Sequence, residues 1–181
     1  MKSLLPFVLV VLAGCAPKPP AHWAGGGAEV DIPFARWVRG DVAVEIHPDG
    51  KVKVNGEHEA TLDRAGRLFD GDGQPIALLE PDGHVTGPDD APLGFVGQNS
   101  ASLPGMATAW IVIRPSGEVL RFDDDGAPTP MGVWTGQCGA TPRTTQVCTL
   151  ITHLMAAKQR SGPRFGISIG VGVGIGVGGR R

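Results

Sequence analysis

A short pattern of apolar and polar positions recurs along the middle of the chain. Four segments have an apolar residue, three further residues, a glycine, a charged residue or histidine, and a second apolar residue. Their glycines are Gly50, Gly66, Gly83 and Gly117, with successive separations of 16, 17 and 34 residues. Because 34 is twice 17, we expect a further unit without its glycine near Ser100.

Each unit carries the residues of a tight turn. Pro48, Pro81 and Pro115 fix φ at the second turn position, and the glycine two residues later accepts a left-handed backbone. Apolar strands are expected at residues 42–46, 59–62, 76–79, 93–96, 110–113 and 131–134. The pattern therefore predicts a mainly β domain over residues 29–136, with five hairpins of about 17 residues in a compact sheet, barrel or flower-like arrangement.

Second turns follow the glycine turns and extend the pattern. They lie at Asp70–Gly73, Pro88–Asp90 and Asp123–Gly126. The combination of a Gly-x-apolar turn, an Asp/Gly turn and an apolar strand resembles the short repeats of the all-β proteins called β-flowers, over residues 42–134. This resemblance implies an all-β repeat fold and no particular activity.

After the last expected strand, the spacing of apolar residues becomes that of a helix. Thr141 offers an N-cap before Pro142, and the helix ends in a basic last turn with Lys158 and Arg160. Apolar residues recur between them at helical spacing, at Val147, Leu150, Ile151 and Leu154. We expect this apolar stripe to cover an open edge or mouth of the β domain, with filling of a partner's groove as the alternative.

Residues 163–181 form a separate tail. From Phe165 to Val177, large apolar residues alternate with Gly or Ser, which is the period of a strand. The many glycines disfavour a helix. We expect a C-terminal strand that pairs with the sheet of the domain, against the alternatives of a mobile tail and of self-assembly or membrane insertion.

The N-terminus has the layout of a secretory signal. Met1-Lys2 precedes an apolar run from Leu4 to Leu12, which is shorter than the roughly 20 residues of a membrane-spanning helix. The run ends in Leu12-Ala13-Gly14-Cys15, which resembles the lipobox of bacterial lipoproteins. In that family the cysteine thiol receives a diacylglyceryl group, the chain is cut before it, and the new amine is commonly acylated.

The lipobox resemblance implies a location and a membrane attachment. Residues 1–14 would be a signal peptide that is removed, and Cys15 would be the lipidated mature N-terminus, anchored in the cell envelope. Ala16 after the cysteine favours the outer membrane, facing the periplasm or the cell surface. Residues 15–28 then form a linker that is Pro-rich and afterwards Gly-rich. The alternative is an ordinary cleaved signal in which Cys15 is incidental.

Two cysteines remain once Cys15 is used. Cys138 and Cys148 lie in segment 137–162, between the β domain and the tail, and the compartment that the signal implies is oxidising. We expect them to form a disulfide that holds the helix start to the last strand and contributes about 2–4 kcal/mol to stability. Two independently buried thiols are the alternative.

Charge and motif content exclude some functions. Without residues 1–14 the chain carries 15 basic and 18 acidic side chains, a net charge of −3, so nothing indicates a nucleic-acid partner. The sequence has no hydrolase, zinc or phosphate-binding motif, and no cofactor or metal is expected. The acidic turn at Asp70–Gly73 lacks the later ligands of a calcium loop.

The histidines also lack partners at useful spacing. His47 and His84 occupy unit positions that hold other polar residues elsewhere, and His58 lies in a turn. His153 is expected to be a partly exposed helix residue.

The sequence thus favours a non-enzymatic lipid-anchored envelope protein with a structural or binding role, whose envelope or cell-wall partner is unknown. A periplasmic hydrolase with an unrecognised site and a protein that assembles or acts on membranes through its tail are the alternatives.

Overall fold

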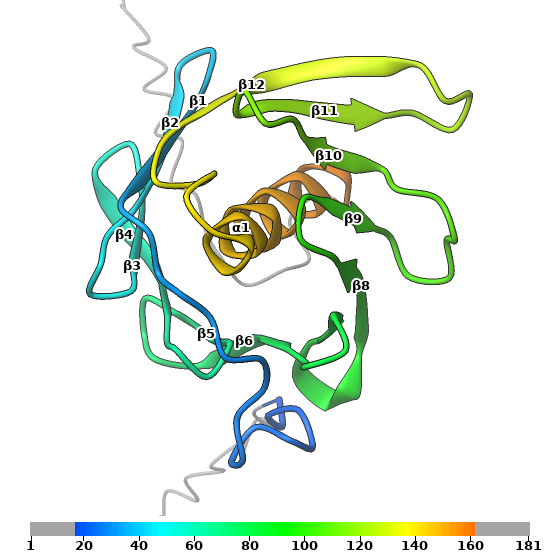
Figure 1. Ribbon diagram of the computed structural model, residues 1–181. Coiled ribbons are helices and arrows are strands. Elements are labelled where there is room, and N and C mark those ends of the chain that lie inside the picture. The colour runs from blue at the N-terminus through cyan, green and yellow to red at the C-terminus, as the bar shows by residue number, and fades with distance from the viewer. Residues whose placement is uncertain (1–16, 162–181) are drawn as a thin grey trace, which may run out of the picture.

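The computed structural model describes residues 17–161, and most of its elements are strands. Twelve antiparallel strands pair with their neighbours along the chain, and β1 pairs with β12 to close a barrel (Figure 1). The strands are β1 (Ala35–Arg39), β2 (Val42–Ile46), β3 (Lys51–Val54), β4 (Glu57–Leu62), β5 (Arg67–Asp70), β6 (Pro75–Leu79), β7 (His84–Thr86), β8 (Pro92–Val96), β9 (Ser100–Ser102), β10 (Ile111–Ile113), β11 (Glu118–Phe122) and β12 (Pro128–Gly136). A 3-10 turn, η1 (Pro88–Asp90), precedes β8, and helix α1 (Pro142–Ser161) follows β12.

The predicted fold class is confirmed at this level. The chain is mainly β with one C-terminal helix, and among the sheet, barrel and flower-like arrangements it forms a closed barrel. The expected strand in residues 163–181 and the signal in residues 1–14 lie outside the described residues.

Main-chain hydrogen bonds explain the turn glycines. The carbonyl of each accepts a hydrogen bond from the amide at or near the end of a following strand, at 2.7 to 2.9 Å, with donors Leu62, Leu79, Val96 and Trp134. At Gly117, φ is +84° and a Cβ would lie 2.2 Å from the Trp134 carbonyl oxygen, so glycine is required. Near Ser100 a tighter turn replaces the glycine turn. There the Asn99 carbonyl accepts the hydrogen bond from the Ile113 amide.

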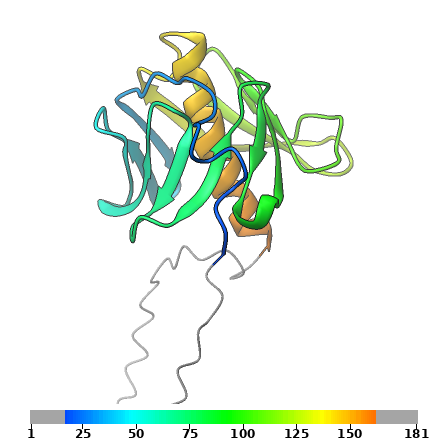
Figure 2. The same ribbon diagram turned by 90° about the horizontal axis from the view of Figure 1, so that it is seen from below.

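Helix α1 runs through the centre of the barrel, where the strands surround it (Figures 1 and 2). Residues 147–153 are all buried, so the helix has no solvent face in this stretch. The expectation that α1 covers an open edge or mouth is therefore wrong. Closure between β1 and β12 removes the edges, and the lumen is the place where the helix buries its apolar side chains.

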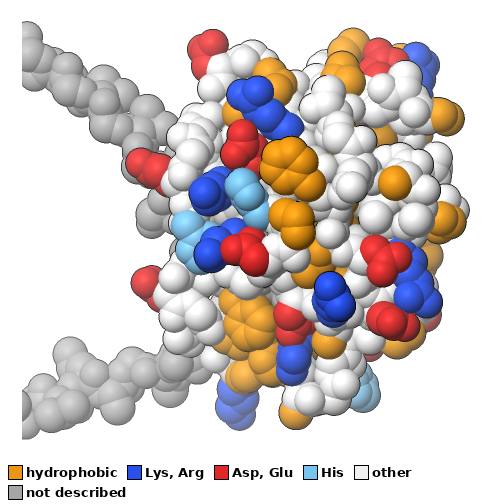
Figure 3. Space-filling view, turned by 60° about the vertical axis from the view of Figure 1, so that its left-hand side comes forward, with side chains coloured by type: hydrophobic (Ala, Val, Ile, Leu, Met, Phe, Trp, Pro, Cys, Tyr) orange, Lys and Arg blue, Asp and Glu red, His pale blue; other side chains and the backbone are white. Residues whose placement is uncertain are grey.

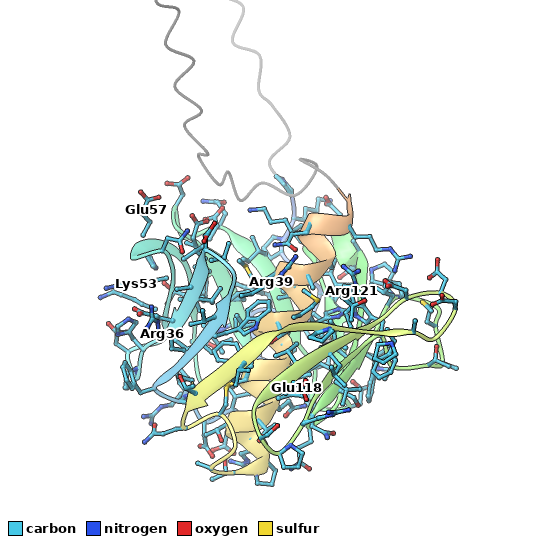
Figure 4. The ribbon with its side chains drawn as sticks, turned by 90° about the horizontal axis from the view of Figure 1, so that it is seen from above. Arg36, Arg39, Lys53, Glu57, Glu118 and Arg121 are labelled. Atoms are coloured by element: carbon cyan, nitrogen blue, oxygen red, sulfur yellow. A yellow bond between two sulfur atoms is a disulfide. The ribbon has the colours of Figure 1, made fainter. Side chains whose placement is uncertain are left out.

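The outer wall of the barrel is polar and mixed in charge. Figure 3 shows acidic, basic and histidine side chains interspersed with hydrophobic ones over the β1–β4 side. Arg36, Lys53 and Glu57 stand on this outside, away from α1 (Figure 4). Arg36 Nε lies 3.4 Å from a carboxylate oxygen of Glu45 on the neighbouring strand. Within residues 17–161 no helix combines the length and hydropathy that a membrane crossing requires.

Candidate functional site

His153 anchors the middle of α1 to the barrel wall. Trp110 Nε1 donates a hydrogen bond to His153 Nδ1 at 2.8 Å, and His153 Nε2 lies 2.8 Å from the Leu93 carbonyl oxygen. Because a carbonyl only accepts, Nε2 carries the proton and the imidazole is neutral. His153 is fully buried, which corrects the expectation of a partly exposed residue. With both ring nitrogens engaged, its role is structural.

Acid is expected to weaken the fold through His153. Burial lowers its pKa from 6.5, and the bond to the Leu93 carbonyl opposes this effect without cancelling it. The unfolded chain therefore binds a proton near pH 6.5 that the folded chain does not, and the free energy of unfolding falls as the pH drops below 6.5. Thermal melts between about pH 7.5 and about pH 5 measure this. His153→Asn should flatten the profile, and an unchanged slope in that variant would contradict the assignment.

Two further tryptophans complete the middle of the lumen. Trp37 Nε1 donates to the Met131 carbonyl oxygen at 2.7 Å, and Trp134 Nε1 donates to Thr152 Oγ1 at 2.8 Å. The two indoles stack with their ring centroids 5.9 Å apart. These bonds join β1, β12 and α1. They give each buried indole N–H a hydrogen-bond acceptor. The middle of the lumen is thus a packed core.

The start of α1 is fixed to the end of β12. Cys138 and Cys148 are joined by a disulfide, with their Cα atoms 5.9 Å apart, and both are buried. Thr141 Oγ1 accepts a hydrogen bond from the Thr144 amide at 3.1 Å, as expected of an N-cap. At this end of the barrel the start of α1 is therefore held to β12 by a covalent bond, and its first turn is capped.

The opposite end holds a cavity, which we call the mouth cavity. It has a volume of about 480 Å³ and lies between the C-terminal half of α1 and the wall formed by β3–β6, η1 and β8. Its lining is predominantly apolar and includes Ala60, Leu68, Ile76, Leu93, Leu154 and Met155. Pro17, the first described residue, also lines it, so the N-terminal segment and the end of α1 meet there (Figure 2). Its volume falls in the range of about 300–1,000 Å³ that small-molecule sites have.

Four charged side chains contribute to this lining. Lys158 Nζ is buried and has no hydrogen-bond partner within residues 17–161; burial lowers the Lys158 pKa, and the charge of Glu59 opposes that shift. Asp70 Oδ1 instead accepts from two amides of its own turn, at 2.8 and 3.0 Å. Asp89 Oδ1 accepts from the Lys18 amide at 3.2 Å. The polar part of the site thus combines one ammonium group with three carboxylates. Two of these carboxylates already accept hydrogen bonds from backbone amides.

The N-terminal segment is attached to the barrel beside this cavity. Asp89 N donates to the Lys18 carbonyl oxygen at 2.8 Å, and Asp90 Oδ1 accepts from the Ala21 amide at 2.8 Å. Farther along, Trp23 packs edge-to-face on Phe69 with ring centroids 4.9 Å apart. The composition of this stretch predicts a spacer, but residues 17–28 make contacts with the barrel that a free spacer would not make.

The other candidate residues from the sequence lie apart from one another. His47 and His84 each lie beside one carboxylate on the outer surface, and His58 pairs with Thr61. Asp70 caps its turn as described, and no three potential metal ligands gather within residues 17–161. The sequence did not indicate the mouth cavity, because its walls come from segments far apart in the chain. Lys158 and Met155 on the last turns of α1 were the available signals.

Comparison with known proteins gives no relative. No family model, no curated protein and no solved structure matches the chain.

Proposed function

We propose that this chain is a non-enzymatic, lipid-anchored protein of the cell envelope whose barrel binds an uncharged apolar chain in the mouth cavity. The apolar cavity of about 480 Å³ carries this proposal. In the middle of the lumen Thr152 and His153 of α1 are paired and the core is filled, so within residues 17–161 the mouth is where the lumen has room for a ligand.

The class of ligand follows from the charges in the lining. Glu59 and Lys158 attract each other, and Asp70 and Asp89 add two further carboxylates. A ligand with an anionic head would meet this excess of negative charge, whereas an uncharged chain contacts the aliphatic side chains alone. Burial of such a chain stabilises the complex by about 0.8 kcal/mol for each methylene. We therefore assign an uncharged acyl chain to the site.

The anchor rests on the lipobox Leu12-Ala13-Gly14-Cys15. A thioether forms between Cys15 Sγ and the glyceryl carbon of a membrane glycerophospholipid, whose phosphate headgroup leaves as the thiol loses its proton. The outer membrane is the proposed location. Cys15→Ala is expected to leave an unprocessed precursor in the cell. Western blotting after membrane fractionation measures this, and processing identical to that of the original chain would contradict lipidation.

The ligand site is tested with a cavity-filling variant. Ala60 is buried on β4 and lines the cavity, so Ala60→Phe places a ring where the ligand would lie. We expect affinity for an uncharged fluorescent apolar probe to fall by about tenfold or more, which corresponds to about 1.4 kcal/mol. Titration of the unlipidated chain measures this. Thr61→Phe adds the same ring at the next, alternate-facing position and should bind normally; equal affinities in all three proteins would contradict the site.

We also propose that the barrel is built from units of about 17 residues, as the glycine spacing predicts. The recurrent hydrogen bond from a strand amide to a turn carbonyl supports this division into units. The unit around Ser100 retains that bond through Asn99 although it lacks the glycine.

A further inference from the structure

We infer that the resident occupant of the mouth cavity is one acyl chain of the protein's own lipid on Cys15. This inference rests on the proposed function, namely on lipidation of Cys15 and on an apolar-chain site in the mouth cavity. It identifies the bound acyl chain as part of the protein's own lipid. The barrel would then hold part of its own anchor instead of a ligand taken from elsewhere.

Two aspartates hold the N-terminal segment at the cavity. Asp89 and Asp90 are consecutive non-glycine residues with φ of +54° and +57°, a conformation that is strained for such residues. In this conformation their carboxylates accept hydrogen bonds from the amides of Lys18 and Ala21, and the Asp89 amide donates to the Lys18 carbonyl. The strained pair therefore fixes the point at which the chain arrives at the barrel.

The attachment point of the lipid is near the cavity lining along the chain. Pro17 itself lines the cavity, and Cys15 precedes it by two residues. Two residues span at most roughly 7 Å, so a lipid on Cys15 starts within that reach of the cavity lining. Attachment at so short a distance makes the binding intramolecular, with an effective concentration of about millimolar or higher. A free lipid would have to compete with that concentration.

The proposed lipid also fits the chemistry of the lining. A diacylglyceryl thioether is uncharged, and its chains match the aliphatic lining that includes Leu68, Ile76 and Met155. A lipoprotein acylated on its amine as well carries three chains. Withdrawal of one into the barrel leaves two for the bilayer, and two chains are enough for stable anchoring. Occupancy of the cavity is thus compatible with attachment to the membrane.

Photo-cross-linking from the anchor tests this inference. Cells that are fed a palmitate analogue with a diazirine in its chain would place the photoreactive group on the lipid of Cys15. The purified full chain is placed in phosphatidylcholine vesicles, irradiated, digested and analysed by mass spectrometry. We expect intramolecular adducts on cavity-lining peptides, at Leu68, Ile76, Leu154 or Met155. Adducts confined to vesicle lipid or to outward-facing residues would overturn the inference.

A second arm separates this inference from the proposed function. The unlipidated chain of residues 16–181, expressed without residues 1–15, is irradiated with a diazirine-bearing monoacylglycerol, which is also uncharged. Adducts in the lining from this free probe, without any from the anchor, would leave the apolar-chain site standing and refute the own-lipid occupant. Absence of lining adducts in both arms would refute both. Ala60→Phe should abolish the lining adducts in either arm, while Thr61→Phe should retain them.

Discussion

Replacing His153 with leucine is expected to lower the free energy of unfolding by about 3–5 kcal/mol. The change leaves the buried Trp110 Nε1–H and the partly buried Leu93 carbonyl without their partner. An unsatisfied buried polar group costs about 1–3 kcal/mol, and two are created here. Chemical denaturation at neutral pH measures the loss.

A double-mutant cycle separates this effect from simple repacking. Trp110→Phe removes the indole donor, so its cost in the His153→Leu background should be smaller than in the original chain by about 0.5–3 kcal/mol. His58→Leu, at an exposed position, should change stability by no more than about 0.5 kcal/mol. Strict additivity of the two lumen substitutions would show that the Trp110–His153 bond does not hold α1 in place.

Gly94→Ala is expected to be the second strongly destabilising change, at about 2–5 kcal/mol. Gly94 has φ of +127°, which side chains rarely adopt. A Cβ would also lie 2.2 Å from the Ser102 carbonyl oxygen and 3.0 Å from His153 Nε2. The strand β8 would have to move away from both β9 and α1, which disturbs the bond between His153 and Leu93.

Gly105→Ala is the matched control for that change. Gly105 also has a positive φ, +75°, but a Cβ there would have no atom within 4 Å among the described residues. It should show backbone strain alone, about 1 kcal/mol. Comparison of thermal unfolding midpoints isolates the contribution of close packing at Gly94. Equal losses in the two variants would contradict the tight approach of β8 to β9 and α1.

Local chemistry made much of the fold predictable. The turn glycines were identified because a left-handed backbone and a close carbonyl exclude other residues, as at Gly117. The helix was placed from Thr141 to Arg160 by its cap, its period and its basic end, and it extends from Pro142 to Ser161. These signals lie within a few residues of one another along the chain.

The position of α1 depended on long-range geometry. Ring closure between β1 and β12 joins residues about 100 apart, and no local pattern encodes it. Thr149, Thr152 and His153 are polar, yet they are buried because carbonyl and indole groups pair with them. Burial of these side chains follows from the barrel around them.

The candidate site was unpredictable for a similar reason. Its lining comes from Pro17, five strands, η1 and the end of α1, which meet only when the barrel has closed. The attachment of the N-terminal segment depends on a left-handed conformation of Asp89 and Asp90, which the sequence presents as an ordinary acidic turn. The likeness of Leu12-Ala13-Gly14-Cys15 to a lipobox was readable from the sequence, whereas the apolar cavity that Pro17 lines was not.

Methyl NMR of the unlipidated chain, titrated with an uncharged monoacylglycerol, tests most directly whether the barrel binds an apolar chain at its mouth. We expect saturable shifts of the Leu68, Ile76, Leu154 and Met155 methyls. Val147, near the disulfide end of α1, should remain unchanged. Shifts confined to the exposed pair Val38 and Val133, or no saturable shift at all, would contradict the proposed site.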